Sequence, residues 1–184
     1  MQNVEHLSCT ELEAGFRALP AAPKDVGRVV LIVCRPREGV RETPESVRLT
    51  PEEGVPGDKW SWGSPRKPNM QIAVMRADVA ALIGNGQPLT MFGDALFVDL
   101  DISAANLPTG TRLRVGDATL EVTPMPHNGC SKFRAKFGDG ALEFVQAKAT
   151  RPQNFRGIYW KVVEPGDARV GSRIEVVARP AVLL

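Results

Sequence analysis

Cysteine, histidine and long hydrophobic runs are all scarce in this sequence of 184 residues, which holds three cysteines and two histidines. The cysteines (Cys9, Cys34 and Cys130) are odd in number and widely separated, and no CxxC pair is present. This pattern argues against a disulfide framework and against a cysteine-rich zinc site, and it suits a reducing compartment. The longest apolar runs, such as residues 29–34, are too short to cross a bilayer, and the N-terminus lacks the basic start and apolar core of a secretory signal. We therefore expect a cytoplasmic protein with no membrane partner.

An excess of charge of one sign is also missing. The net charge is +2, with 23 basic and 21 acidic residues, and no basic block or aromatic-interleaved basic stripe occurs. Nucleic acid is therefore not an expected partner, although a small anionic ligand can still meet a local cluster of arginine and lysine. The length suits one domain with a proper hydrophobic core. Glycine-rich nucleotide-binding loops and a strand–helix alternation are absent, which disfavours a parallel nucleotide-binding sheet.

Apolar and β-branched runs bounded by glycine or proline predict strands. These runs are residues 27–34, 70–75 and 156–163. Apolar residues at helical spacing predict helices instead, and these cover residues 9–19, 76–83 and 139–148. Thr10 and Glu13 form a capping pattern for the first helix. The long polar stretch of residues 35–68, broken by proline and glycine, is typical of a functional loop.

Two similar segments predict β-hairpins. In the first, TRLRVGDATLEVT, alternating apolar residues flank a two-residue Gly-Asp turn at positions 116–117. In the second, ARVGSRIEVV, Val170 precedes the turn at 171–172, and Ile174 and Val176 follow it. Hairpins of this kind favour a mainly β fold, namely a mostly antiparallel β-barrel with a few short helices packed around it.

Cys130 lies in the segment with the densest set of chemically useful residues, PMPHNGCSKF (124–133). Two prolines and a glycine fix the backbone there, and His127 and Lys132 are close in sequence. Nearby positive charge, or a helix that starts at Ser131, would favour the thiolate, which is a strong nucleophile and a soft ligand for molybdenum, zinc or copper. The alternative is a small, inert, buried thiol in a loop.

Two further clusters have a functional and a structural interpretation. In VPGDKWSWG (55–63), tryptophans two apart in a strand would point the same way and could line a pocket, or they could pin the loop to the barrel. In RPQNFRGIYW (151–160), Arg151 and Arg156 flank Asn154. Arginine suits phosphate geometry, but solvation at the surface is its more common fate.

Four segments, taken in order along the chain, resemble the MOSC domain, which is named for the C-terminal domain of molybdenum-cofactor sulfurase. VPGDKW resembles the early G-D-[RK]-H segment of the family, and MFGDALFVDLDIS resembles its G-E-N-L stretch. LPTGTRLRVGDATLEVTPMPHNGCSKF is similar to the hairpin that leads to the family cysteine, and FRGIYWKVVEPGDARVGSRIEVV to the closing R-G-x-Y strand and G-D hairpin. Two segments depart from the pattern: Trp60 replaces the histidine, and Gly93-Asp94-Ala95 stands where the family has G-E-N.

The resemblance implies a barrel of the pyruvate-kinase type over residues 26–184, preceded by a helical extension over residues 1–25. It also implies a link to the molybdenum cofactor (molybdopterin) or to sulfur transfer. The family cysteine that ligates molybdenum falls on Cys130. The expected cofactor-binding residues are Arg156, Lys132, Lys59, His127, Asn128 and Asp58.

Three functions follow as hypotheses. The first is a reductase component that acts on N-hydroxylated or similar small substrates, with Cys130 as molybdenum ligand and separate electron-donor proteins. The second is a sulfur carrier in which a cysteine desulfurase loads Cys130 as a persulfide. The third is a non-catalytic barrel that presents Trp60 and Trp62 to a small ligand. The sequence leaves open whether the protein is an enzyme.

Overall fold

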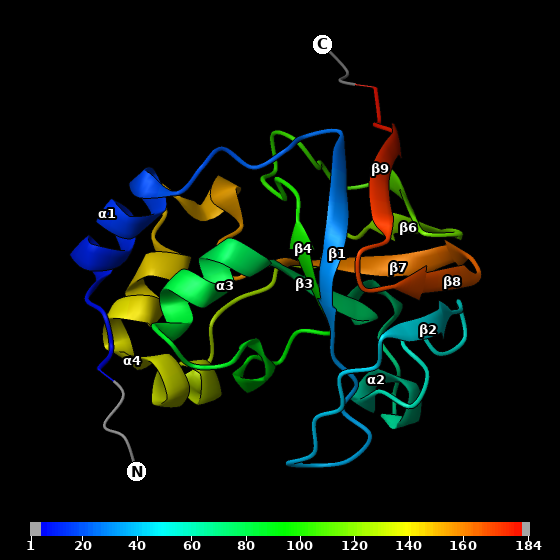
Figure 1. Cartoon of the computed structure of the whole chain (residues 1–184), viewed down its shortest axis with the longest axis horizontal. Coiled ribbons are helices and arrows are strands. Elements are labelled where there is room, and N and C mark those ends of the chain that lie inside the picture. Colours follow the sequence, from blue (N-terminus) through cyan, green and yellow to red (C-terminus); the bar gives the residue numbers. More distant parts are fainter. Residues whose placement is uncertain (1–4, 182–184) are drawn as a thin grey trace.

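Seven strands close a β-barrel in the computed structural model, which describes residues 5–181 (Figure 1). Around the barrel the order is β1 (Val26–Ile32), β4 (Leu96–Asp99), β3 (Ile72–Arg76), β7 (Ile158–Glu164), β6 (Ala118–Val122), β5 (Arg112–Val115) and β9 (Arg173–Ala178). All neighbouring strands are antiparallel except β3 and β4, which are parallel. The predicted barrel, mostly antiparallel, is therefore confirmed.

The first predicted hairpin is β5 and β6, and its alternation explains its place in the barrel. Leu113 pairs with Leu120 and Val115 with Ala118, and all four side chains are buried. Because successive residues of a strand point to opposite faces, the alternation of apolar and polar residues directs one set into the barrel. Trp160 of β7, fully buried, fills the same interior.

The second predicted hairpin is wrong as a pairing. The chain does turn at residues 170–172, but the strand before the turn, β8 (Gly166–Arg169), pairs with β2 (Ser46–Leu49) in a separate two-stranded sheet. The strand after it, β9, pairs with β1 and β5. Local alternation predicts that a strand exists, whereas its partner is chosen by packing between residues far apart in sequence.

Helices contribute about as much of the chain as strands, which is more than the few short helices expected. The helices are α1 (Cys9–Ala18), α2 (Lys59–Trp62), α3 (Ala77–Gly84) and α4 (Ser131–Gln146), with short 3-10 turns between elements. Helices α1, α3 and α4 gather on one side of the barrel, and α2 lies apart from them near β2 (Figure 1). None of the helices within residues 5–181 is long and apolar enough to span a membrane.

Helix α4 starts eight residues before the predicted start at Asp139. It begins at Ser131, and Gly138 breaks the helical geometry midway with a φ of 87°. This start is the one considered above for the helix after Cys130, whereas the prediction of residues 139–148 missed the first half of α4 because glycine lowers helix propensity. The buried positions Phe133, Phe137, Ala141 and Phe144 nevertheless follow helical spacing, and they pack into a second core with Leu12 of α1. This core fixes the start of α4, and with it Cys130, against the barrel.

Two other local expectations need correction. Helix α1 is confirmed, but its capping box is formed by Ser8 and Glu11, two residues before the predicted pair. The segment β3–α3–β4 is a parallel strand–helix–strand unit, so the expected absence of strand–helix alternation is wrong for this segment. Helix α3 is too short, and the alternation of apolar and polar residues in β4 is too weak, for the sequence pattern to indicate such a unit.

Candidate functional site

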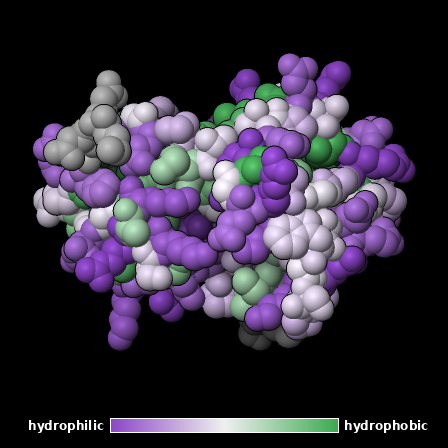
Figure 2. Space-filling view, turned by 90° about the horizontal axis from the view of Figure 1, so that it is seen from below, coloured by the Kyte–Doolittle hydropathy of each residue, from purple (hydrophilic) through white to green (hydrophobic). Residues whose placement is uncertain are grey.

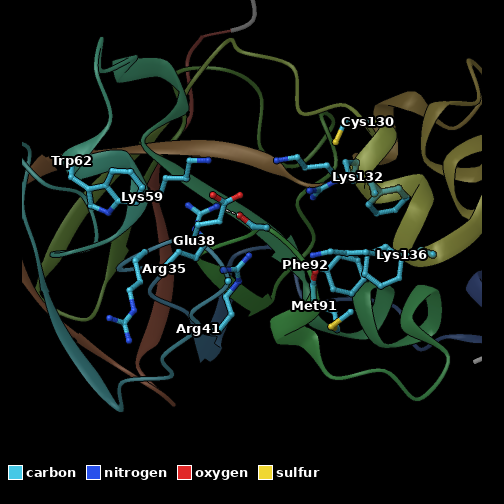
Figure 3. Close-up of a pocket in the computed structure, with 16 residues that line it drawn as sticks. Arg35, Glu38, Arg41, Lys59, Trp62, Met91, Phe92, Cys130, Lys132 and Lys136 are labelled. Atoms are coloured by element: carbon cyan, nitrogen blue, oxygen red, sulfur yellow. Dashed lines mark hydrogen bonds between the residues drawn. The ribbon is translucent and has the colours of Figure 1, made fainter. Parts of the chain in front are cut away.

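A basic cavity with a volume of about 430 Å³ lies between the barrel and helix α4 (Figure 3). Seven basic side chains and one acidic side chain, that of Glu38, line it. The basic residues are Arg35, Arg37 and Arg41 after β1, Lys59 of α2, Lys132 and Lys136 of α4, and Arg156 before β7. The surface seen from below in Figure 2 is hollowed and hydrophilic between the helical side and the barrel side. So large an excess of positive charge in a concave site attracts anionic ligands.

Cys130 lines this basic cavity and is exposed. It is the residue before the first turn of α4, and its carbonyl accepts a hydrogen bond from the Arg134 amide. Figure 3 shows Cys130 and Lys132 on the α4 side of the cavity, with Lys59 on the opposite side. The thiol is therefore open to solvent and to a guest molecule, and basic side chains surround it in the cavity.

Arg156 is held in the cavity wall by a buried carboxylate. Its Nη1 lies 2.7 Å from Asp94 Oδ2 and 3.0 Å from Oδ1, and its guanidinium lies 5.2 Å from the centre of the Phe133 ring. Asp94 is fully buried, and Arg156 Nε is buried without a hydrogen-bond partner among residues 5–181. Asp94 belongs to the segment that departs from G-E-N, and here its side chain positions an arginine.

His127 is buried on the other side of the same carboxylate. Its Nδ1 lies 3.5 Å from Asp94 Oδ1 but forms no hydrogen bond with any described residue, and its ring lies 4.4 Å from the ring of Tyr159. Burial lowers the pKa of His127 from its ordinary value of 6.5 to about 4, although the Asp94 charge opposes the shift. The imidazole is therefore neutral at neutral pH. It does not line the cavity that contains Cys130.

Asp58 has a structural task next to the cavity. It is buried, caps the start of α2 through the Trp60 amide, and accepts hydrogen bonds from the backbone amide and guanidinium of Arg35 at 2.6–2.8 Å. Arg35 also donates to the carbonyl of Gly93. Asp58 thus holds Arg35 in the cavity wall without lining the cavity itself. Asn128 is exposed and lines neither this cavity nor the one beside it.

A second cavity, of about 320 Å³, adjoins the basic cavity and shares Arg35, Lys59 and Gly93 with it. Trp60 lines the second cavity and Trp62 the first. The expectation that the two tryptophans point the same way from a strand is wrong, because they lie in helix α2, where residues two apart point to different sides.

Comparison with known families decides which family the chain represents. The family model of the MOSC domain matches residues 58–175, well over half of the sequence. The chain belongs to the MOSC family. No functionally curated protein matches the sequence.

Solved structures of related shape agree with the MOSC fold. YuaD from Bacillus subtilis superposes with a TM-score of 0.62 at 17% identity, over 82% of this chain and 95% of that one. YiiM from Geobacillus stearothermophilus gives 0.55 at 17% identity, over 83% and 76%, and YiiM from Escherichia coli gives 0.55 at 20%, over 84% and 71%. At these identities the likeness shows the fold.

The basic cavity contains basic residues that the sequence analysis did not single out. Arg35, Arg37 and Arg41 come from the loop expected to be functional, where three arginines occur within seven residues. Lys136 follows Lys132 by one helical turn, and its Nζ donates to the Met91 carbonyl at 2.6 Å. Burial, together with neighbouring cations such as Arg41, lowers the pKa of Lys136. Helical spacing of the two lysines was the available signal, but it needed the correct start of α4.

Of the predicted cluster Arg151, Asn154 and Arg156, only Arg156 lines the basic cavity. Arg151 is exposed, and Asn154, in left-handed conformation, donates from its amide to the Ile102 carbonyl at 2.8 Å. Four of the expected site residues, Cys130, Lys132, Lys59 and Arg156, line one cavity. Their roles as ligands remain predictions.

A metal at Cys130 would need most of its ligands from a guest molecule. Within residues 5–181, no group of three or more histidine, cysteine, aspartate or glutamate side chains is arranged to hold a metal ion. One thiolate does not complete a coordination sphere, so a metal would arrive with its own organic ligand.

Proposed function

We propose that this MOSC protein binds the molybdenum cofactor in the basic cavity and serves as a reductase component for N-hydroxylated or similar small molecules. The observation that carries the proposal is that an exposed thiol and seven basic side chains line one cavity of about 430 Å³. Sulfur is a suitable soft ligand for a transition metal, and arginine and lysine are the usual partners of a phosphate.

The residues present fit the cofactor. Arg156 Nε is buried at the cavity wall and lacks a partner among the described residues, so it can donate to an anionic guest. Arg156, Lys132 and Lys59 would hold the phosphate, and the Cys130 thiolate would ligate the metal. When bound, the cofactor supplies the two-electron redox chemistry of molybdenum. Separate electron-donor proteins would deliver the reducing equivalents.

Molybdenum content tests this proposal directly. We expect protein made in a host competent for the cofactor to contain about one molybdenum per chain by inductively coupled plasma mass spectrometry, and Cys130→Ser to lose it. Cys9→Ser is the matched control, because Cys9 lies in α1 and does not line the cavity. Lys132→Ala should lower the pterin content. Wild-type protein without molybdenum, from cells that load another molybdenum enzyme, would refute the proposal.

A sulfur-carrier function is the second candidate, favoured by the exposure of Cys130 at the start of α4. A partner protein can reach this sulfur. The thiolate would attack the outer sulfur of a persulfide on a cysteine desulfurase, forming a Cys130 persulfide and releasing the donor thiolate. Incubation with a cysteine desulfurase and free cysteine should add one sulfur atom, detected by intact-protein mass spectrometry. The same adduct on Cys130→Ser would contradict this reading.

A further inference from the structure

The second cavity, here called the aromatic cavity, has its own chemical character. Three aromatic rings line it, together with four basic side chains and no acidic one: Trp60, His127 and Tyr159, with Arg35, Lys59, Arg66 and Lys67. Its volume of about 320 Å³ falls in the range of small-molecule sites. The combination of flat apolar faces and positive charge suits a flat guest that carries an anionic group.

The rings are fixed before any guest arrives. The Trp60 indole Nε1 donates to the Lys67 carbonyl at 2.9 Å, and the Arg66 guanidinium lies 5.8 Å from the centre of the Trp60 ring. The His127 and Tyr159 rings pack together at 4.4 Å. Since these rings are already held, a guest that stacks on them orders few side chains, which favours affinity.

His127 is a buried ring in the wall of the aromatic cavity. Its side chain is more than nine-tenths buried, yet its Nδ1 has no hydrogen-bond partner among residues 5–181. That nitrogen faces Asp94 Oδ1 at 3.5 Å, so the buried carboxylate holds one edge of the ring while the residue lines the aromatic cavity.

Positive charge is concentrated where the two cavities meet. Arg35 and Lys59 line both of them, and Arg35 is fixed there by its ion pair with Asp58 at 2.6 Å. Lys59 forms no ion pair within the described part of the chain. An anionic group at this boundary would lie between a positioned guanidinium and a free ammonium, while a ring attached to it reaches Trp60.

We infer that the aromatic cavity binds a nucleotide-like ligand, with a planar heteroaromatic ring against Trp60 and Tyr159 and a phosphate at Arg35 and Lys59. The ligand is a free nucleotide or the nucleotide portion of a larger conjugate, since both present the same ring and phosphate. The inference goes beyond the proposed cofactor function and does not require molybdenum at Cys130.

Calorimetric titration with AMP, adenosine and inorganic phosphate tests the inference. AMP should bind more tightly than either fragment, because only AMP fills the boundary and the aromatic cavity together. Stacking on an aromatic side chain contributes about 1–3 kcal/mol per base, so Trp60→Leu should weaken AMP binding by roughly 5- to 150-fold. Trp62→Leu, in the same short helix but outside the aromatic cavity, should change it less than about twofold.

Trp60→Phe separates stacking from loop anchoring. It keeps an aromatic face but loses the hydrogen bond from the indole to the Lys67 carbonyl. AMP affinity within about threefold of wild type supports stacking. Loss equal to that of Trp60→Leu, in variants whose circular dichroism matches wild type, would overturn the inference. So would AMP binding no tighter than inorganic phosphate.

The source of the ligand is distinguished by mass spectrometry of the small molecule released when the purified protein is denatured. A free nucleotide and a larger phosphate-linked conjugate differ in mass. Because the readout is nucleotide binding, this inference and the molybdenum proposal fail separately. Protein that contains molybdenum but binds AMP with the same affinity after Trp60→Leu would refute only nucleotide binding in the aromatic cavity.

Discussion

Replacing Asp94 by alanine should destabilise the protein more than any surface charge substitution. Asp94 is 0% exposed, and it neutralises Arg156, whose side chain is 9% exposed. Its two oxygens lie 2.7 and 3.0 Å from Arg156 Nη1, and one lies 3.5 Å from His127 Nδ1. The alanine variant leaves the guanidinium buried without a counter-charge.

Breaking a buried ion pair by removing one partner costs about 3–5 kcal/mol. Arg156 borders a cavity that solvent can enter, so the lower end applies, about 3 kcal/mol. For a chain of this length each kcal/mol corresponds to roughly 2–4 °C in Tm, so the expected fall is about 6–12 °C. Asp94→Asn keeps a hydrogen-bond acceptor and should lose less.

Urea unfolding followed by circular dichroism gives the free energy, and thermal unfolding gives Tm. Asp167→Ala is the matched control, because Asp167 pairs with Arg48 at 3.3 Å while both side chains are 62–67% exposed. Exposed pairs contribute about 0–1 kcal/mol. Equal destabilisation by Asp94→Ala and Asp167→Ala would refute the view that the buried pair anchors Arg156.

Two further predictions concern His127 and helix α1. The folded pKa of His127 is about 4, so the unfolded chain, with a pKa of about 6.5, binds the extra proton first. The contribution of His127 to stability is therefore complete above pH 6.5 and is lost towards pH 4, about 3 kcal/mol in all. His127→Phe should make the free energy of unfolding, measured in urea at a series of pH values, depend less on pH in that range. The same pH dependence in wild type and variant would contradict the shift. Leu12→Ala, at a fully buried position of α1, should cost about 2–5 kcal/mol in a single unfolding transition. If α1 instead unfolded in a separate transition before the rest of the protein, residues 1–25 would be an extension that folds independently of the barrel.

Local sequence patterns predicted the elements that are stabilised by their own periodicity. The alternation around the turn at 116–117 places Leu113, Val115 and Leu120 inside the barrel, and the burial confirms it. The two-residue turn fixes the register of that hairpin, so sequence and structure agree residue by residue. The apolar runs of β1, β3 and β7 were found for the same reason.

Pairings between distant segments were not predictable in the same way. β8 pairs with β2 although more than a hundred residues separate them, and a strand pattern carries no information about its partner. The orientation of Trp60 and Trp62 depended on whether residues 59–62 are helix or strand, and the Asp58 cap that decides it looked like part of a turn. Because Gly138 interrupts the helical pattern, residues 131–138 were not predicted as helix, and the position of Lys136 on that helix was missed.

The basic cavity is compatible with folding because two carboxylates outside it neutralise two of the arginines that line it. Asp58 holds Arg35 and Asp94 holds Arg156, each through an ion pair of 2.6–2.7 Å from a buried carboxylate. Lys59 and Lys132 have no such partner among residues 5–181. A guest anion therefore meets two arginines that are positioned but already neutralised, and two lysines whose charge is uncompensated. Most of the electrostatic attraction should then come from the lysines, which are exposed and screened by salt, while the arginines fix the orientation of the guest.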